Sequence, residues 1–154
     1  MRLTQRLLLG ALLIVGVLVA LILTVVDRQI SARLRDDATT FLAREARLVG
    51  DLWVREPDHP DSLADRTGRA LGRRVTLVRE DGVVIGDSEF DGDSLRNLQN
   101  HAERPEVAAA RRGETGIARR PSPSTGDVEL YVAVAVPGHG VAASPSRRRV
   151  SMRW

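Results

Sequence analysis

The sequence predicts a mixed protein of the α/β (α+β) class, in which an N-terminal transmembrane helix continues into an outer helix and a small antiparallel-sheet domain follows. Three observations predict this fold class. Residues 7–26 form an uncharged apolar run. Residues 128–136 alternate apolar and other side chains with the period of a strand. The triplet Glu80-Asp81-Gly82 separates two short segments rich in β-branched residues, as in a β-hairpin.

The apolar run at 7–26 predicts a membrane anchor. About 20 helical residues cross the roughly 30 Å hydrocarbon core of a bilayer. A cleaved signal peptide is the alternative, but its apolar region is usually about 7–15 residues long and ends in a small-x-small site, which is missing before Asp27. Arg2 and Arg6 place residues 1–6 in the cytoplasm by the positive-inside rule. The sequence therefore predicts a single-pass protein of the plasma (inner) membrane whose remaining residues lie outside.

The outer helix should extend from residue 27 to about Arg55, before Pro57. Apolar residues recur at spacings of three and four from Ile30 to Trp53. Two interpretations stay open: the helix packs on its own domain, or it forms the seam of a homodimer. The seam is indicated by Leu34, Phe41 and Leu48, which repeat every seven residues.

The outer domain is expected to occupy residues 27–140. A short helix should be capped by Ser62 and end at Gly72. Two further short helices should follow, the second beginning at Pro105 and ending at Gly113. Together with the outer helix, the predicted helices and strands occupy residues 27–55, 62–71, 73–79, 83–86, 94–99, 105–112, 115–120 and 128–136.

Residues 141–154 read as a disordered tail rich in Arg and Ser. The segment has no periodicity, and Pro145 and the three arginines at 147–149 disfavour a strand. The domain would then be incomplete at its C-terminal end, and the strand at 128–136 would have an unpaired edge. Such an edge predicts a marginally stable, aggregation-prone domain.

Composition argues against several classes of protein. The formal net charge is only +3 and aromatic residues make up 3%, which does not predict nucleic-acid binding. Cysteine is absent, so no disulfide can form. His59, His101 and His139 share no metal-ligand spacing, and no nucleophile or phosphate-loop motif occurs. We therefore expect neither an enzyme nor a bound cofactor.

An acidic loop offers the candidate metal ligands Asp87, Glu89, Asp91 and Asp93. Their spacing resembles the first half of a calcium loop, but Leu98 stands where the bidentate Glu is required. A solvated loop is the favoured interpretation.

Basic residues offer a candidate ligand site. Arg104, Arg119 and Arg120 would converge on an anion if the last hairpin packs against the helix at 105–112, whose N-terminus would assist. Surface arginines are the common alternative. His101 is either a ligand-site residue or satisfies the turn before Pro105.

Three segments carry a family resemblance. They are VTLVREDGVVIGDSE at 75–89, NHAERPEV at 100–107 and ARRPSPSTGDVELYVAVAVP at 118–137. These segments resemble the sensor region of phosphate-regulon-type (PhoR-like) bacterial sensor histidine kinases. The order of elements also resembles small extracytoplasmic sensor domains of the PAS/Cache-like kind.

The resemblance implies a signal-sensing module of a two-component sensor histidine kinase. It also implies a second membrane helix, a HAMP linker, a helix bearing the phosphorylated His and an ATP-binding domain, none of which this sequence contains. The sequence departs from the family at about Ala142, as a truncation or change of reading frame would cause. We therefore expect a membrane-anchored homodimeric sensor without its kinase region, for an unknown ligand. The alternative is a free-standing single-pass protein that acts by binding or dimerisation.

Overall fold

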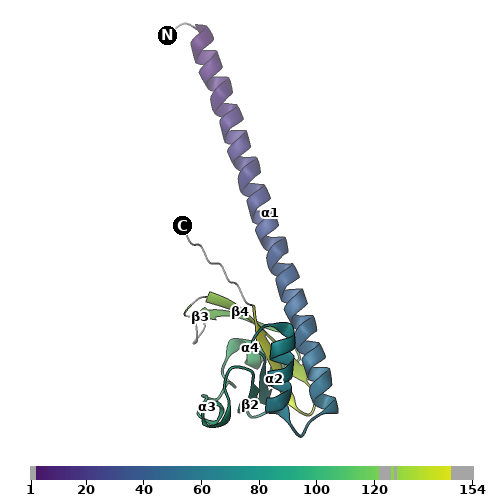
Figure 1. The fold of residues 1–154 in the computed structure, drawn as a ribbon. Helices are drawn as coiled ribbons and strands as arrows, with labels where there is room; N and C mark the ends of the chain where they lie inside the picture. Colours follow the sequence, from purple (N-terminus) through teal and green to yellow (C-terminus); the bar gives the residue numbers. More distant parts are fainter. Residues whose placement is uncertain (1–2, 122–125, 127, 147–154) are drawn as a thin grey trace. The chain divides into compact units, whose positions relative to one another are not determined.

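A computed structural model describes residues 3–121, 126 and 128–146 of the chain, and the side chains among them other than those of 3–11, 30–32, 34 and 35. The chain forms two compact units, Met1–Asp37 and Ala38–Trp154. Helix α1 (Leu3–Arg55) begins in the first unit and ends in the second (Figure 1). It ends at the residue that the sequence predicts.

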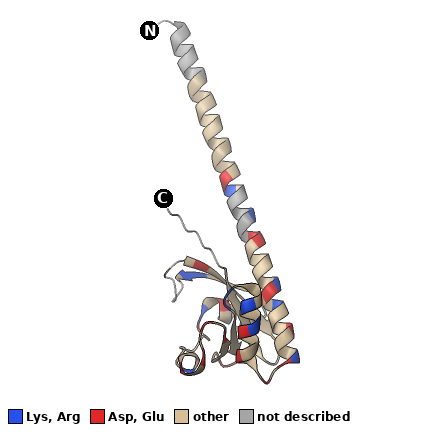
Figure 2. Cartoon of the chain, in the orientation of Figure 1, with Lys and Arg blue, Asp and Glu red and all other residues tan. Residues whose placement is uncertain are grey.

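The first unit consists of the N-terminal part of α1. Within the described residues, Leu12–Gln29 is long and apolar enough to cross a membrane. Its side chains are exposed, and its only charges are Asp27 and Arg28 at the end (Figure 2). An exposed helical surface of this kind is stable only when an apolar environment covers it.

The second unit is built on a five-stranded antiparallel sheet in the order β2-β1-β5-β4-β3. The strands are β1 (Thr76–Arg79), β2 (Val84–Asp87), β3 (Gly116–Pro121), β4 (Val128–Val136) and β5 (Gly140–Pro145). Both predicted hairpins are confirmed, and the β4 register runs without a bulge.

The expected disordered tail at 141–154 is wrong for its first five residues. They belong to β5, the central strand, in which Ala142 pairs with Val134 of β4 and Leu77 of β1. Small apolar side chains suit this position because both faces of the strand are covered. Pro145 lies at the strand end, where a missing N–H costs least.

Strand β4 is therefore paired on both sides, by β5 and β3, and its expected unpaired edge is wrong as well. The edge strands of the sheet are β2 and β3. The arginines at 147–149 lie outside the described residues.

One face of the sheet is covered by α1 and by α2 (Pro60–Leu71). Helix α2 starts one turn earlier than its Ser62 signal predicts, because Pro60 occupies the first helical position. It ends at Gly72, whose φ of 64° is the left-handed conformation that glycine favours. The core here is apolar and comprises Leu42, Ala43, Ala46, Val49, Trp53, Leu63, Ala64, Val75, Leu77, Val132, Val134, Val136 and Ala142.

The opposite face is covered by α4 (Pro105–Arg111) and by the segment that holds α3 (Gly92–Arg96). Its apolar cluster is smaller and comprises Val78, Val84, Val107, Ala110, Ala133, Val141 and Ala143. Leu95 and Leu98 pack against it. Charged and polar side chains occupy the rest of this face, and they form the candidate site.

Candidate functional site

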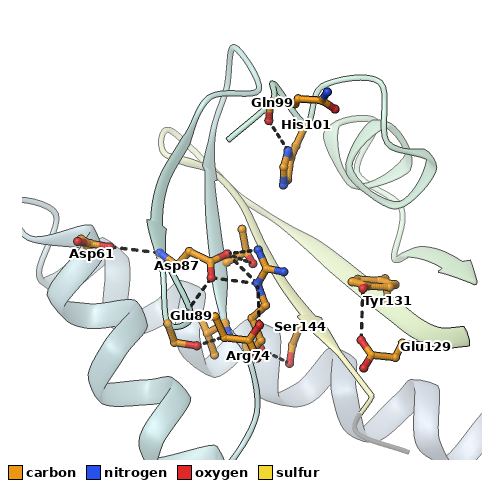
Figure 3. A network of polar contacts seen from close by, with 12 residues as sticks. Asp61, Arg74, Asp87, Glu89, Gln99, His101, Glu129, Tyr131 and Ser144 are labelled. Atoms are coloured by element: carbon orange, nitrogen blue, oxygen red, sulfur yellow. Dashed lines mark hydrogen bonds and ion pairs between the residues drawn. The ribbon is translucent and has the colours of Figure 1, made fainter. Parts of the chain in front are cut away.

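Arg74 and Asp87 form a buried ion pair between the start of β1 and the end of β2 (Figure 3). Arg74 donates to Asp87 at 2.7–2.9 Å, and the Thr76 hydroxyl donates to Asp87 at 2.7 Å. The backbone N–H of Glu89 donates to the same carboxylate at 3.0 Å. Asp87 is fully buried. Its oxygens are satisfied by fixed donors, so this pair serves the structure of the strand ends.

A second ion pair joins α4 to β3. Arg120 donates to Glu106 Oε1 at 3.1 Å from one terminal nitrogen, and the Arg120 guanidinium lies 3.6 Å from the centre of the Tyr131 ring. Glu106 is only 1% exposed, and its Oε2 has no hydrogen-bond partner among the described residues. A Cβ on Gly116 would lie 1.8 Å from the Glu106 carbonyl oxygen, so glycine is required for α4 to approach β3 this closely.

His101 is buried in the loop before α4. Its Nδ1 lies 2.6 Å from the Gln99 carbonyl oxygen (Figure 3). A carbonyl only accepts, so Nδ1 carries the proton and Nε2 is an acceptor. Burial and, next, the positive charge of Arg104 lower the pKa of His101 to about 4. The neutral ring therefore presents an acceptor, and Nε2 has no partner among the described residues.

Arg104 supplies the positive charge of the site. Its guanidinium is half-buried and makes no hydrogen bond or ion pair with the residues that the structure describes. Burial and then the nearby Arg120 lower the pKa of Arg104 to about 10, so the group stays charged at neutral pH. The Glu106 carboxylate opposes this lowering, and the N–H groups of Arg104 remain available to an anionic acceptor.

These groups line one pocket on the α4 face of the sheet. The free space is about 10 Å³, about enough for one water molecule. A larger ligand would have to displace a side chain, and Arg104 has no bond to hold it in place. The pocket is lined by Arg74, Thr76, Val78, His101, Arg104, Glu106, Val107, Arg120, Tyr131, Ala143, Ser144 and Pro145.

The arrangement can bind a small anion. Asp87 balances the charge of Arg74, and Glu106 balances the charge of Arg120. The positive charge of Arg104 is the net charge of the pocket. Among the described residues no three His, Cys, Asp or Glu side chains come together to hold a metal ion.

Comparison with known proteins identifies the fold. No protein-family model matches the chain, and no curated protein matches it. The sensor domain of the Vibrio cholerae histidine kinase DctB is similar, with a TM-score of 0.52 and 19% identity over 75% of this chain and 49% of that one. The ligand-binding domain of the Campylobacter jejuni chemoreceptor Tlp3 in complex with L-norvaline is also similar, with a TM-score of 0.53 and 10% identity over 75% and 51%.

The second unit has a Cache-like sensor-domain fold. Another Tlp3 structure, in complex with 4-methylisoleucine, gives a TM-score of 0.52 at 9% identity over 75% of this chain and 52% of that one. The chain spans about half the length of these solved domains.

The Cache-like domain brings together three of the four predicted ligand-site residues. His101, Arg104 and Arg120 line the pocket, because the last hairpin packs against α4 as expected. Arg119 does not join them. It neighbours Arg120 on β3, so its side chain points to the opposite face of the strand and is exposed.

Of the four acidic residues proposed as metal ligands, one is buried and three are exposed. The favoured interpretation of a solvated loop is wrong for Asp87, which is buried against Arg74. Glu89, Asp91 and Asp93 are exposed. Because Asp87 is committed to three donors, the four carboxylates do not form a cation site.

Sequence reasoning missed Arg74 and Glu106. Glu106, in the first turn of α4, forms the ion pair with Arg120. A signal for Arg74 existed, since Arg74, Thr76 and Val78 share one face of a strand at a two-residue period. An arginine on the same face as a buried valine indicates a buried partner.

Proposed function

We propose that this chain is a membrane-anchored, extracytoplasmic signal-sensing module that binds a small anion on the α4 face of its Cache-like domain. One observation carries the proposal: Arg104 is charged, half-buried and without a hydrogen bond or ion pair to the described residues, in a pocket that also holds two buried acceptors. One similar domain is the sensor domain of a histidine kinase and another is a ligand-binding domain in complex with L-norvaline, which supports a binding role over catalysis.

A thermal-shift screen of the full chain in detergent tests this function. Small carboxylates and inorganic phosphate should raise the melting temperature, because a ligand that binds only the folded state stabilises it. Arg104→Gln should remove the shift. Arg119→Gln is the matched control, since it removes an exposed arginine 15 residues further along the chain. If no anion shifts the wild-type melting temperature, the proposed function is wrong.

We further propose that α1 anchors the domain outside the plasma membrane, with the N-terminus in the cytoplasm. The support is the apolar Leu12–Gln29 segment and the preceding arginines. The chain has no native cysteine, so Glu80→Cys in the exposed β1–β2 turn gives a single label site. A membrane-impermeant maleimide should label it in intact cells. Labelling only after lysis would reverse the orientation.

We propose that the chain is related to the sensor region of PhoR-like histidine kinases. The support is the three sequence segments named above, and the Cache-like fold is compatible with this relation. A second membrane helix and kinase motifs encoded directly downstream, in this or another reading frame, would support a kinase origin. Their absence would favour a free-standing membrane-anchored binding protein.

We also propose that two copies pair along α1. Phe41 and Leu48, which are seven residues apart, are 54% and 62% exposed. The side chain of Leu34, the third residue of the repeat, lies outside the described ones. Disulfide crosslinking should be stronger for Leu48→Cys than for Arg47→Cys, which is exposed on another side of the helix. Equal crosslinking at both positions would argue against this seam.

A further inference from the structure

The pocket contains two buried acceptors that lack donors. His101 Nε2 and Glu106 Oε2 have no hydrogen-bond partner among the described residues, and their side chains are 2% and 1% exposed. The His101 acceptor follows from its geometry, because Nδ1 donates to the Gln99 carbonyl. Glu106 keeps Oε2 free because Arg120 occupies Oε1. A ligand that completes this pocket must bring a hydrogen-bond donor.

Arg104 requires a hydrogen-bond acceptor on the ligand. Its planar guanidinium offers several N–H donors and has no acceptor among the described residues. A carboxylate fits this fork with two parallel hydrogen bonds. The ligand must therefore carry an anionic acceptor at one end and a donor at another.

The charges of the pocket select among ligands of this kind. Arg74 is compensated by Asp87 and Arg120 by Glu106, His101 is neutral, and Arg104 alone adds a positive charge. A monoanion with a neutral donor neutralises that charge. A zwitterionic amino acid would leave it uncompensated and would place an ammonium among three arginines.

Apolar side chains on the pocket wall also favour an organic ligand over inorganic phosphate. Val78, Val107 and Ala143 line the same space. They offer contacts to a short carbon skeleton and no hydrogen bond to a phosphate oxygen.

We propose that the ligand is a short hydroxycarboxylate, whose carboxylate binds Arg104 and whose hydroxyl donates to His101 Nε2 or Glu106 Oε2. This inference rests on the proposed function, because it names the ligand class of the same pocket. The free space holds about one water, so even a small member of the class requires the Arg104 side chain to move.

Isothermal titration of the full chain in detergent with four probes tests the ligand class. Lactate, propionate and alanine share a three-carbon skeleton and carry a hydroxyl, no donor and an ammonium, respectively. Phosphate is the fourth probe. Lactate should bind at least about tenfold more tightly than each of the others, because only lactate satisfies both the guanidinium and a buried acceptor without adding positive charge.

Two further measurements identify the hydroxyl contact. 2-Methoxypropionate, which lacks the hydroxyl hydrogen, should bind no better than propionate to the wild-type chain. His101→Phe keeps a ring in the buried position and should bring lactate to the affinity of propionate if Nε2 is the acceptor. Unchanged lactate affinity in this variant assigns the hydroxyl to Glu106, provided that the methoxy probe still binds weakly.

The results separate the two proposals. If propionate, alanine or phosphate binds as tightly as lactate, and Arg104→Gln abolishes that binding, the ligand class is wrong and the anion-sensing function stands. The ligand class is also wrong if 2-methoxypropionate binds as well as lactate. If no probe and no anion of the broader screen binds, the pocket holds water only and both proposals fail.

Discussion

The two faces of the sheet differ in what their residues do. The face under α1 and α2 is packed with aliphatic side chains and Trp53. The face under α4 has a smaller apolar cluster and is completed by two ion pairs, a neutral histidine and an arginine that forms no ion pair with the described residues. Apolar burial is the main source of folding free energy, whereas unpaired buried polar groups reduce it. The larger apolar core under α1 and α2 therefore contributes more to the stability of the domain, and the α4 face holds the pocket for which we propose a binding role.

The largest effect should come from the α1 face. Trp53→Ala removes a side chain that is only 2% exposed and leaves a cavity. We expect a loss of about 4–5 kcal/mol in the free energy of unfolding, measured by chemical denaturation of the full chain in detergent. Leu52→Ala, one residue earlier and partly exposed, should cost much less. Equal losses at both positions would contradict the packing of this face.

The second largest effect should come from the Arg74–Asp87 ion pair on the α4 face. Asp87→Asn leaves the buried Arg74 guanidinium without its main partner, and we expect a loss of about 3 kcal/mol. This value is at the low end of the usual range, because Glu89 remains 3.9 Å from Arg74. Asp93→Asn, at the exposed start of α3 where Asp93 pairs with Arg96, is the control and should lower the free energy of unfolding by less than about 1 kcal/mol. A loss below about 1 kcal/mol for Asp87→Asn would contradict the burial of Asp87 and favour a solvated side chain.

A pH titration should detect the buried histidine. The pKa of His101 is about 4 in the folded chain against the ordinary histidine value of 6.5, so the unfolded state binds the proton more tightly. Its contribution is fully present above pH 6.5 and is lost as the pH falls toward 4. The fall amounts to about 2–3 kcal/mol. Relative to wild type, His101→Phe should lack this loss, and a parallel pH profile in both proteins would contradict it.

The α1 face was easier to predict from sequence than the α4 face. Its apolar residues recur at helical and strand periods, as at Val132, Val134 and Val136. Such periods can be recognised in the sequence without knowledge of the fold. The ion pairs of the α4 face join residues 13 and 14 positions apart, and a charged residue carries no periodic signal of burial. Arg119 and Arg120 are adjacent in sequence, and only the register of β3 shows which one faces the pocket.

Strand β5 was missed for a related reason. Composition after Gly140 indicates a tail, because Pro145 and the later arginines disfavour a strand. Its place between β1 and β4 is fixed by partners that lie far away in the sequence. A central strand of small side chains, Val141-Ala142-Ala143, needs little intrinsic propensity when both edges are paired.

The most direct test of this division between the faces is the stability of Arg104→Met beside that of Arg119→Met, each measured with the full chain in detergent and without ligand. Arg104 is half-buried and has no hydrogen bond or ion pair with the described residues, so replacing it with an apolar side chain should leave the free energy of unfolding unchanged or raise it by about 0.5–1 kcal/mol. Arg119→Met should change it by less than about 0.5 kcal/mol. The same Arg104→Met protein should lose the anion-induced rise in melting temperature that Arg119→Met keeps. A loss of more than about 1 kcal/mol on Arg104→Met, with the anion response intact, would show that Arg104 serves stability and that the α4 face is not the binding face.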